Sequence, residues 1–174
     1  SDSLNIFTFG ENLKIKLVNL TLINCDNRPV DAYVLTMNDN IVINSKTIRA
    51  QSNNNVAFIN NLTVINGTSQ AINAYNLKLT NSLFENCNAD TSTGLLWLSN
   101  NGYITYLENN TFKGNTISGY SGGAAYYAQG NLVSINNTFD SNTVTGSASY
   151  VAYASANNIT SINDKYINNN VTNY

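Results

Sequence analysis

One pattern recurs four times in the chain at nearly constant spacing: an aromatic residue, two variable residues, and then Asn or Cys. It covers residues 84–87, 112–115, 139–142 and 166–169, and its aromatic residues lie 28, 27 and 27 positions apart. A fixed period of this size, in segments rich in β-branched and aromatic residues, is typical of a β-solenoid, in which each repeat forms one turn of a coil. The repeat therefore predicts an all-β fold built from parallel strands.

Columns of apolar residues keep step with this repeat to within one residue. One column precedes the aromatic residues (Leu77, Ile104, Leu132, Ile159) and one follows them (Ala89, Ile117, Val144, Val171). In stacked parallel strands, a residue that faces inward lies about 4.8 Å from its equivalents in the turns above and below. We therefore expect the aromatic residues to stack inside the coil, with both aliphatic columns lining the stack. The hydroxyl of the last of them, Tyr166, needs a partner or a place near the open end.

The turns are clearest in the last part of the chain, at residues 94–121, 122–148 and 149–174, where each holds three strand-like segments. Residues 55–69 are too few for a full turn, so we expect an irregular or narrowed coil there. We predict a single domain over residues 1–174, with about six turns of roughly 27 residues. It is irregular before about residue 70 and regular from about 76 to 174. Because the chain starts without Met and stops within a repeat, we take it to be part of a longer protein.

The composition is dominated by Asn, with 35 Asn among 174 residues against one Pro and no His. Asn tolerates left-handed backbone conformations and suits the sharp corners between strands, although AT-rich coding DNA produces the same bias. Only 10% of the residues are charged and the net charge is −2. We expect no nucleic-acid binding, because the chain lacks the Lys and Arg density that phosphate contacts need. We expect no membrane insertion by this segment either, since no apolar run approaches about 18 residues.

The two cysteines occupy equivalent positions. Cys87 stands where the later repeats have Asn, and Cys25 holds the same place in an earlier turn. At this period they lie at least two rungs apart, or roughly 10 Å. A disulfide needs Cα atoms within about 7 Å, so we predict two free thiols.

The glycine-rich start of one turn supports a comparison with known families. Residues 122–126 read Gly-Gly-Ala-Ala-Tyr, and residues 137–142 follow with Asn-Thr-Phe-x-x-Asn. This pairing resembles the repeats of chlamydial polymorphic outer-membrane proteins and, more closely, the adhesin-like surface proteins of methanogenic archaea. The resemblance covers residues 76–174 well and residues 1–75 loosely. It implies a right-handed parallel β-helix, export to the cell surface, and attachment to other cells or surfaces. It supplies no catalytic residues.

Many polysaccharide lyases and glycosidases use such a coil, so a carbohydrate-active enzyme is an alternative. For such an enzyme, the best carboxylate pair in the sequence is Glu85 and Asp140, and we place both outside the coil. Their backbones should lie about 9.6 Å apart, near the upper limit for the two carboxyl groups of an inverting glycosidase. Lys113 lies between them, so a surface charge stack is the simpler interpretation. We assign no catalytic residue and no cofactor.

A second acidic group, near Arg28, comprises Asp26, Asp31 and Asp39. It is either a solvated loop or a calcium site. We favour the loop and assign no metal.

Seven Asn-x-Ser/Thr sequons occur, at Asn19, Asn61, Asn66, Asn109, Asn136, Asn158 and Asn170. That number is close to chance for a chain so rich in Asn, Ser and Thr. The positions of Asn109 and Asn136 are more informative, because these residues are equivalent corners of successive turns, where glycans would crowd one ridge.

Aromatic residues in the C-terminal half exceed what one core column can hold. The candidate binding residues are Trp97, Tyr103, Tyr106, Tyr120, Tyr126, Tyr127, Tyr150 and Tyr153. Tyr and Trp bind sugars and proteins through flat apolar faces with a polar rim. We therefore expect an extracellular, adhesin-like module whose partner is a glycan or protein on another cell. A passive stalk or surface spacer is the alternative. We also expect end-to-end association, because residues 166–174 lack the charged residues and Pro that discourage strand pairing.

Overall fold

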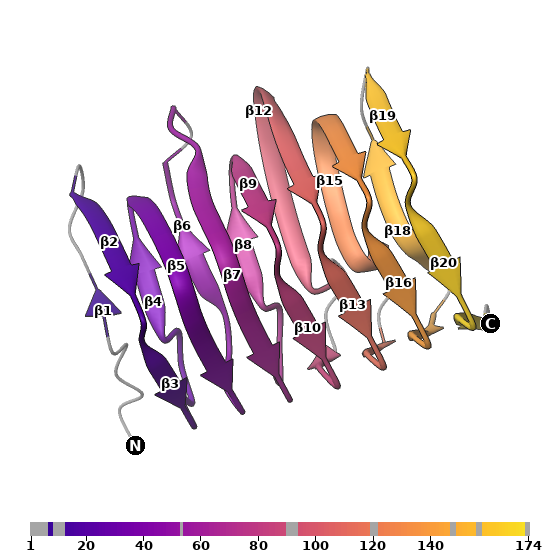
Figure 1. The fold of residues 1–174 in the computed structure, drawn as a ribbon, viewed down its shortest axis with the longest axis horizontal. Helices are drawn as coiled ribbons and strands as arrows, with labels where there is room; N and C mark the ends of the chain where they lie inside the picture. The colour runs from indigo at the N-terminus through magenta and orange to yellow at the C-terminus, as the bar shows by residue number, and fades with distance from the viewer. Residues whose placement is uncertain are drawn as a thin grey trace.

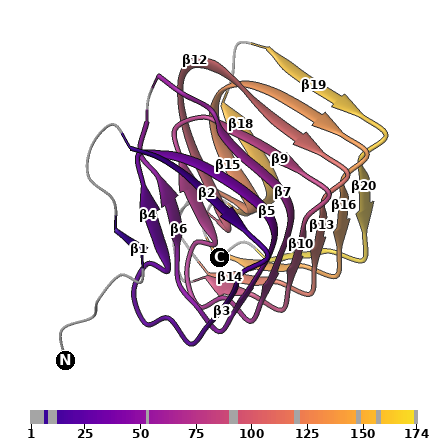
Figure 2. The ribbon, with the colours of Figure 1, turned by 60° about the vertical axis from the view of Figure 1, so that its left-hand side comes forward.

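The computed structural model describes residues 7–8, 13–52, 54–89, 94–118, 122–146, 149–155 and 158–172. These residues form strands and no helix, so the described part contains no helix suited to crossing a membrane. The strands pair in parallel, in one continuous 17-stranded sheet and a second sheet of four strands. Successive turns stack along the long axis of the molecule (Figure 1), and the view in Figure 2 shows them one behind another. The all-β, solenoid-like architecture is confirmed.

Three sides of the coil belong to the large sheet. The front face contains β2 (Lys14–Val18), β5 (Val34–Ile43), β7 (Ala57–Ile65), β9 (Leu77–Thr80), the second halves of β12 (Leu96–Glu108) and β15 (Gly122–Ile135), and β19 (Ile159–Ile162). The lower face contains β3 (Thr21–Ile23), the ends of β5 and β7, β10 (Leu83–Glu85), β13 (Thr111–Lys113), β16 (Thr138–Asp140) and β20 (Lys165–Ile167). The rear face contains β1 (Phe7–Thr8), β4 (Val30–Ala32), β6 (Ile48–Ala50), β8 (Ile72–Ala74), the first halves of β12 and β15, and β18 (Ser149–Ser155).

The predicted aromatic stack runs through the core of the lower face. The Phe84, Phe112 and Phe139 rings are fully buried and stacked, with centroids 4.9 and 5.2 Å apart. The Tyr166 ring extends the stack, with its centroid 4.6 Å from that of Phe139. It lies on the last rung, however, and Tyr166 is 52% exposed. Upstream, the same column continues through aliphatic residues, namely Val64, Val42 and Leu22.

This column also shows that the turns become longer along the chain. Successive members are closer together in the sequence between Leu22 and Phe84 than between Phe84 and Tyr166. The longer turns contain the four-stranded sheet of β11 (Asn88–Ala89), β14 (Thr116–Ser118), β17 (Thr143–Thr145) and β21 (Asn170–Thr172). The coil before residue 70 is therefore narrower, and its strands remain in parallel register.

One of the two predicted aliphatic columns is confirmed and the other needs a correction. Ala89, Ile117, Val144 and Val171 pair in register. In the other column it is Thr105 that pairs with Leu132, while Ile104 is 53% exposed. Ile104 lies on the opposite side of the strand from Thr105, because side chains alternate.

Two corners in every turn carry a residue with left-handed backbone conformation. The first corner holds Asn19, Asp39, Asn61, Asn81, Asn109, Asn136 and Asn163, and the second holds Asn24, Asn44, Asn66, Asn86, Gly114, Ser141 and Asn168. Asn and Gly adopt positive φ at the least cost, so the coil itself requires such residues at these positions. At Gly114 an added Cβ would lie 2.8 Å from the Asn86 side chain, so that side chain would have to move.

Several of these corner residues are followed by a polar side chain that hydrogen-bonds to a neighbouring turn. After the second corner, which we call the lower corner, Asn142 Oδ1 accepts hydrogen bonds from the backbone N–H and the Nδ2 of Asn115. Asn169 Oδ1 accepts the same two hydrogen bonds from Asn142. An equivalent ladder follows the first, or upper, corner and consists of Asn110, Asn137 and Asp164. These ladders satisfy backbone groups that the sharp corners take out of the sheet.

Cys25 and Cys87 belong to the lower ladder column and are free, buried thiols. Ser45 and Gly67 separate them: the Cys25 N–H donates to Ser45 Oγ, and Gly67 lies against Cys87 Sγ. Burial raises the pKa of the Cys87 thiol to about 11.

Candidate functional site

The candidate aromatic residues do not form one surface. Trp97 is half-buried on the rear face, whereas Tyr106 lies on the front face, and Tyr150 is exposed beside Gly123. Tyr127 and Tyr153 follow Trp97 in register along the rear face, although their side chains lie outside the described residues. The Tyr103 side chain and the whole of Tyr120 also lie outside them.

Tyr126 belongs to the core, so its placement on an exposed binding surface is wrong. Its register partners Ile72 and Leu96 are inward-facing, and Tyr126 is only 5% exposed. The ring packs edge-on against Phe139 at 6.1 Å. Its hydroxyl accepts a hydrogen bond from Ser134 and donates one to Tyr166, and burial raises its pKa. These contacts also provide the partner that the Tyr166 hydroxyl needs.

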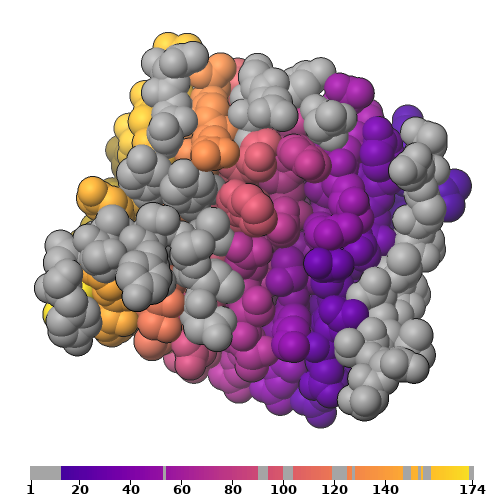
Figure 3. All heavy atoms as spheres, turned by 180° about the vertical axis from the view of Figure 1, so that it is seen from behind, coloured from indigo at the N-terminus to yellow at the C-terminus, as the bar shows by residue number. Residues whose placement is uncertain are grey.

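A groove on the rear face of the described coil is a candidate binding site. It has a volume of about 220 Å³ and is lined by Arg49, Ala50, Gln51, Asn73, Tyr75, Trp97 and Ser99. Arg49, Asn73 and Trp97 are register partners on β6, β8 and β12. Two positions later on the same turns lie Gln51, Tyr75 and Ser99. Because side chains alternate along a strand, these residues lie on the same outer side of the sheet. Figure 3 looks onto this face of the coil.

A buried carboxylate holds one edge of this rear-face groove. Asp31 precedes Arg49 in the same column and is 5% exposed. Its Oδ1 accepts hydrogen bonds from Arg49 Nε at 3.1 Å and from Gln51 Nε2, and its Oδ2 lies 3.5 Å from Arg28 Nη1. These contacts orient Arg49 and Gln51. The expectation that Asp31 belongs to a solvated loop is wrong, and its lone pairs are directed at these donors rather than at a calcium ion.

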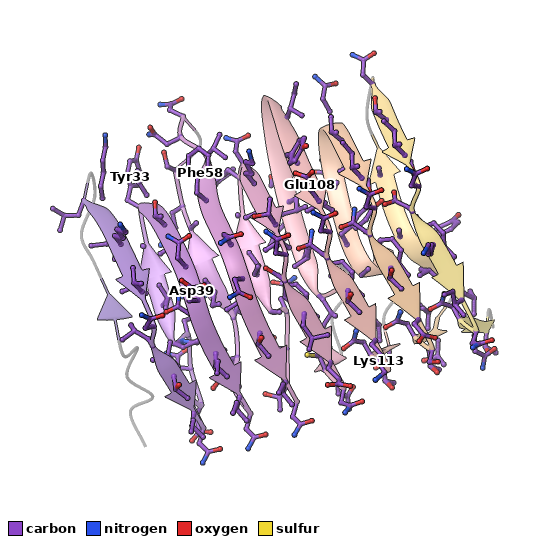
Figure 4. The ribbon with its side chains drawn as sticks, in the orientation of Figure 1. Tyr33, Asp39, Phe58, Glu108 and Lys113 are labelled. Atoms are coloured by element: carbon purple, nitrogen blue, oxygen red, sulfur yellow. The ribbon has the colours of Figure 1, made fainter. Side chains whose placement is uncertain are left out.

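The front face carries a flatter set of exposed side chains. Phe58, Lys78 and Tyr106 are register partners, and Lys78 Nζ lies 5.1 Å from the centre of the Tyr106 ring, a cation–π contact. Phe58 is 51% exposed. Figure 4 shows Phe58 and Glu108 on this side of the coil. This face is well separated from the rear-face groove, because the core lies between them.

The acidic residues are distributed over several faces. Glu85, Lys113 and Asp140 are register partners, and Lys113 Nζ lies 3.1 Å from Glu85 Oε1, as expected of a surface charge stack. Asp39 is a corner residue that accepts a hydrogen bond from Asn61. Across the described ranges, no three His, Cys, Asp or Glu side chains come together as metal ligands.

Reasoning from sequence missed five polar or aromatic side chains that line the rear-face groove: Arg49, Gln51, Asn73, Tyr75 and Ser99. The first four precede Phe84 and lie in the shorter turns, where the period of the later repeats does not align them. A local signal was present, because 48–50, 72–74 and 96–98 each read apolar, variable, apolar. The middle positions of these triplets are Arg49, Asn73 and Trp97, and alternation places them outside the coil.

Comparison with known proteins finds no match among family models, curated proteins or solved structures. The residues of the rear-face groove and their chemistry are therefore the guide to function.

Proposed function

We propose that this chain is an extracellular, adhesin-like binding module of a cell surface, and that its rear-face groove holds a glycan. The observation that carries the proposal is the position of Trp97 in a groove with Asn73 and Gln51. The resemblance to adhesin-like proteins of methanogenic archaea supports the same function. It also supports a right-handed parallel β-helix, with about six turns of roughly 27 residues where the repeat is regular.

The chemistry of the rear-face groove suits a sugar. An indole ring provides a flat apolar surface for the C–H face of a pyranose, and the amides of Asn73 and Gln51 both donate and accept hydrogen bonds to hydroxyls. Strands β6, β8 and β12 position these side chains, and the Asp31 contacts orient Gln51. A preorganised site of this kind loses little entropy on binding.

A glycan array followed by calorimetry tests the proposal. The wild-type chain should bind a defined set of glycans and leave them uncleaved in a parallel saccharide-cleavage assay. Trp97→Ala should weaken binding at least about tenfold, since truncation of a central Trp commonly costs about 2 kcal/mol or more. Phe58→Ala, which removes an exposed aromatic ring from the front face, is the matched control and should bind normally. Equal losses in both variants, or no glycan binding by the wild type, would contradict the proposal.

A second candidate function, that of a stalk or spacer, is favoured by the last rung of the coil. Ile159, Tyr166 and Val171 occupy core columns yet are 53%, 52% and 40% exposed. Such an apolar edge favours association with a second copy of the chain. The spacer hypothesis expects concentration-dependent end-to-end association in sedimentation experiments and its loss in Ile159→Lys. A chain that stays monomeric at millimolar concentration would contradict it.

A further inference from the structure

The charge that the rear-face groove presents to a ligand is positive, because Arg49 lines it, although the net charge of the chain is −2. The cluster at its edge contains Arg28, Arg49 and Asp31, which together carry one positive charge. Of these, Arg49 lines the groove, and it has the only formal charge among the described lining residues. A bound ligand therefore meets a cation and no carboxylate.

The guanidinium of Arg49 is oriented and partly available. Its Nε–H is directed at Asp31 Oδ1 at 3.1 Å, and its side chain is 29% exposed. An arginine has four further N–H donors on its two Nη atoms, which form a planar fork. The structure gives these donors no acceptor among the described residues. Because Asp31 fixes one edge of the guanidinium, the other edge can form paired hydrogen bonds to a carboxylate without a large loss of side-chain entropy.

We propose that the rear-face groove selects saccharides that bear a carboxylate over neutral saccharides. Arg49 binds the carboxylate, Trp97 packs against the sugar ring, and Asn73 hydrogen-bonds to ring hydroxyls. The groove volume of about 220 Å³ suits one or two sugar rings. A single arginine is too little charge for nucleic acids, which require several phosphate contacts. This inference rests on the proposed glycan-binding function and adds the chemical class of the ligand.

The test compares a hexuronic-acid oligosaccharide with its methyl ester, which has the same ring but no charge. Calorimetry with the 174-residue chain at low salt should show at least about tenfold tighter binding of the acid, because charge-assisted hydrogen bonds are roughly twice as strong as neutral ones. Raising the salt concentration should reduce this preference. Arg49→Gln should bind the acid and the ester equally. Lys78→Gln removes the same charge from the front face and should keep the full preference.

A second variant guards against loss of folding, since Arg49→Gln removes a partner of the buried Asp31. Arg49→Lys keeps the charge but loses the planar fork, so it should show an intermediate preference. Equal binding of acid and ester by the wild type, or an unchanged preference in folded Arg49→Gln, overturns this inference and leaves the glycan proposal standing. Failure of the wild type to bind any saccharide overturns both.

Discussion

Replacing Asn142 by Ala should destabilise the coil strongly, because Asn142 is the central link of the lower amide ladder. It is 1% exposed, and its Oδ1 accepts from the backbone N–H and the Nδ2 of Asn115 at 3.1 and 2.9 Å. Its Nδ2 donates to the Phe112 carbonyl at 2.9 Å. The substitution removes the acceptor of the Asn115 N–H, one of the two acceptors of Asn115 Nδ2, which also donates to the Phe84 carbonyl, and a donor to the Phe112 carbonyl. A buried polar group that loses its partner costs about 1 to 3 kcal/mol, so we expect a loss of about 2 to 3 kcal/mol.

Urea unfolding followed by circular dichroism measures this loss. Asn88→Ala, on the exposed side of β11, is the matched control and should change the free energy of unfolding by less than about 0.5 kcal/mol. Asn142→Ser should fall between the two, because Ser45 already acts as a short acceptor in the same column, for the Cys25 N–H. If Asn142→Ala costs no more than Asn88→Ala, the ladder does not stabilise the turns as we argue.

Three further predictions concern the core. Phe112→Ala should cost about 3 to 5 kcal/mol in urea unfolding, because the ring is fully buried between two stacked neighbours; a cost below about 1 kcal/mol would refute the stack. Thr105→Val should raise the free energy of unfolding by about 1 kcal/mol, since Thr105 Oγ1 is buried and has no hydrogen-bond partner among the described residues; lower stability would reveal a hidden partner. Because burial raises the Cys87 pKa from 9.0 to about 11, its neutral thiol contributes stability that is complete below pH 9 and lost as the pH rises toward 11. Cys87→Ala should lack this part of the alkaline decline, and an identical decline in both proteins would contradict it.

The aromatic stack could be predicted from sequence because its period is nearly constant. Between Phe84 and Tyr166 the lengths of successive turns agree to within one residue, so equivalent residues line up by counting. The assignment of Ile104 failed because it allowed an error of one position: Thr105 lies seven residues before Phe112, as Leu132 does before Phe139, and Ile104 lies on the opposite side of the strand. A period known to within one residue is sufficient to predict the fold class. It is not sufficient to predict whether a given side chain faces the core or the solvent.

The abundance of Asn had two explanations from sequence, corner geometry and AT-rich coding DNA. The structure supports the first, because 11 of the 13 described non-glycine residues with positive φ are Asn. Others, such as Asn115 and Asn142, form the buried ladders that follow these corners. Many Asn residues therefore have positions that the backbone and the corner hydrogen bonds require.

The candidate site could not be predicted in full, because its residues recur at a different spacing along the chain from that of the aromatic column. Arg49, Asn73 and Trp97 are successive members of one column at equal intervals, and these intervals differ from those of the aromatic column. Loops of unequal length separate the two columns within each turn. No single period aligns both, so only the stacked strands bring these three side chains together.

Sequence reasoning was sufficient to predict the all-β solenoid class, the inward stack of Phe84, Phe112 and Phe139, and the separation of the two cysteines. Each of these follows from local alternation and a repeating length. The burial of Tyr126, the ion pair between Asp31 and Arg49, and the groove beside Trp97 could be seen only in the folded chain. These features depend on which residues of different turns become neighbours. That is set by the lengths of the loops between strands, and the repeat motif does not encode those lengths.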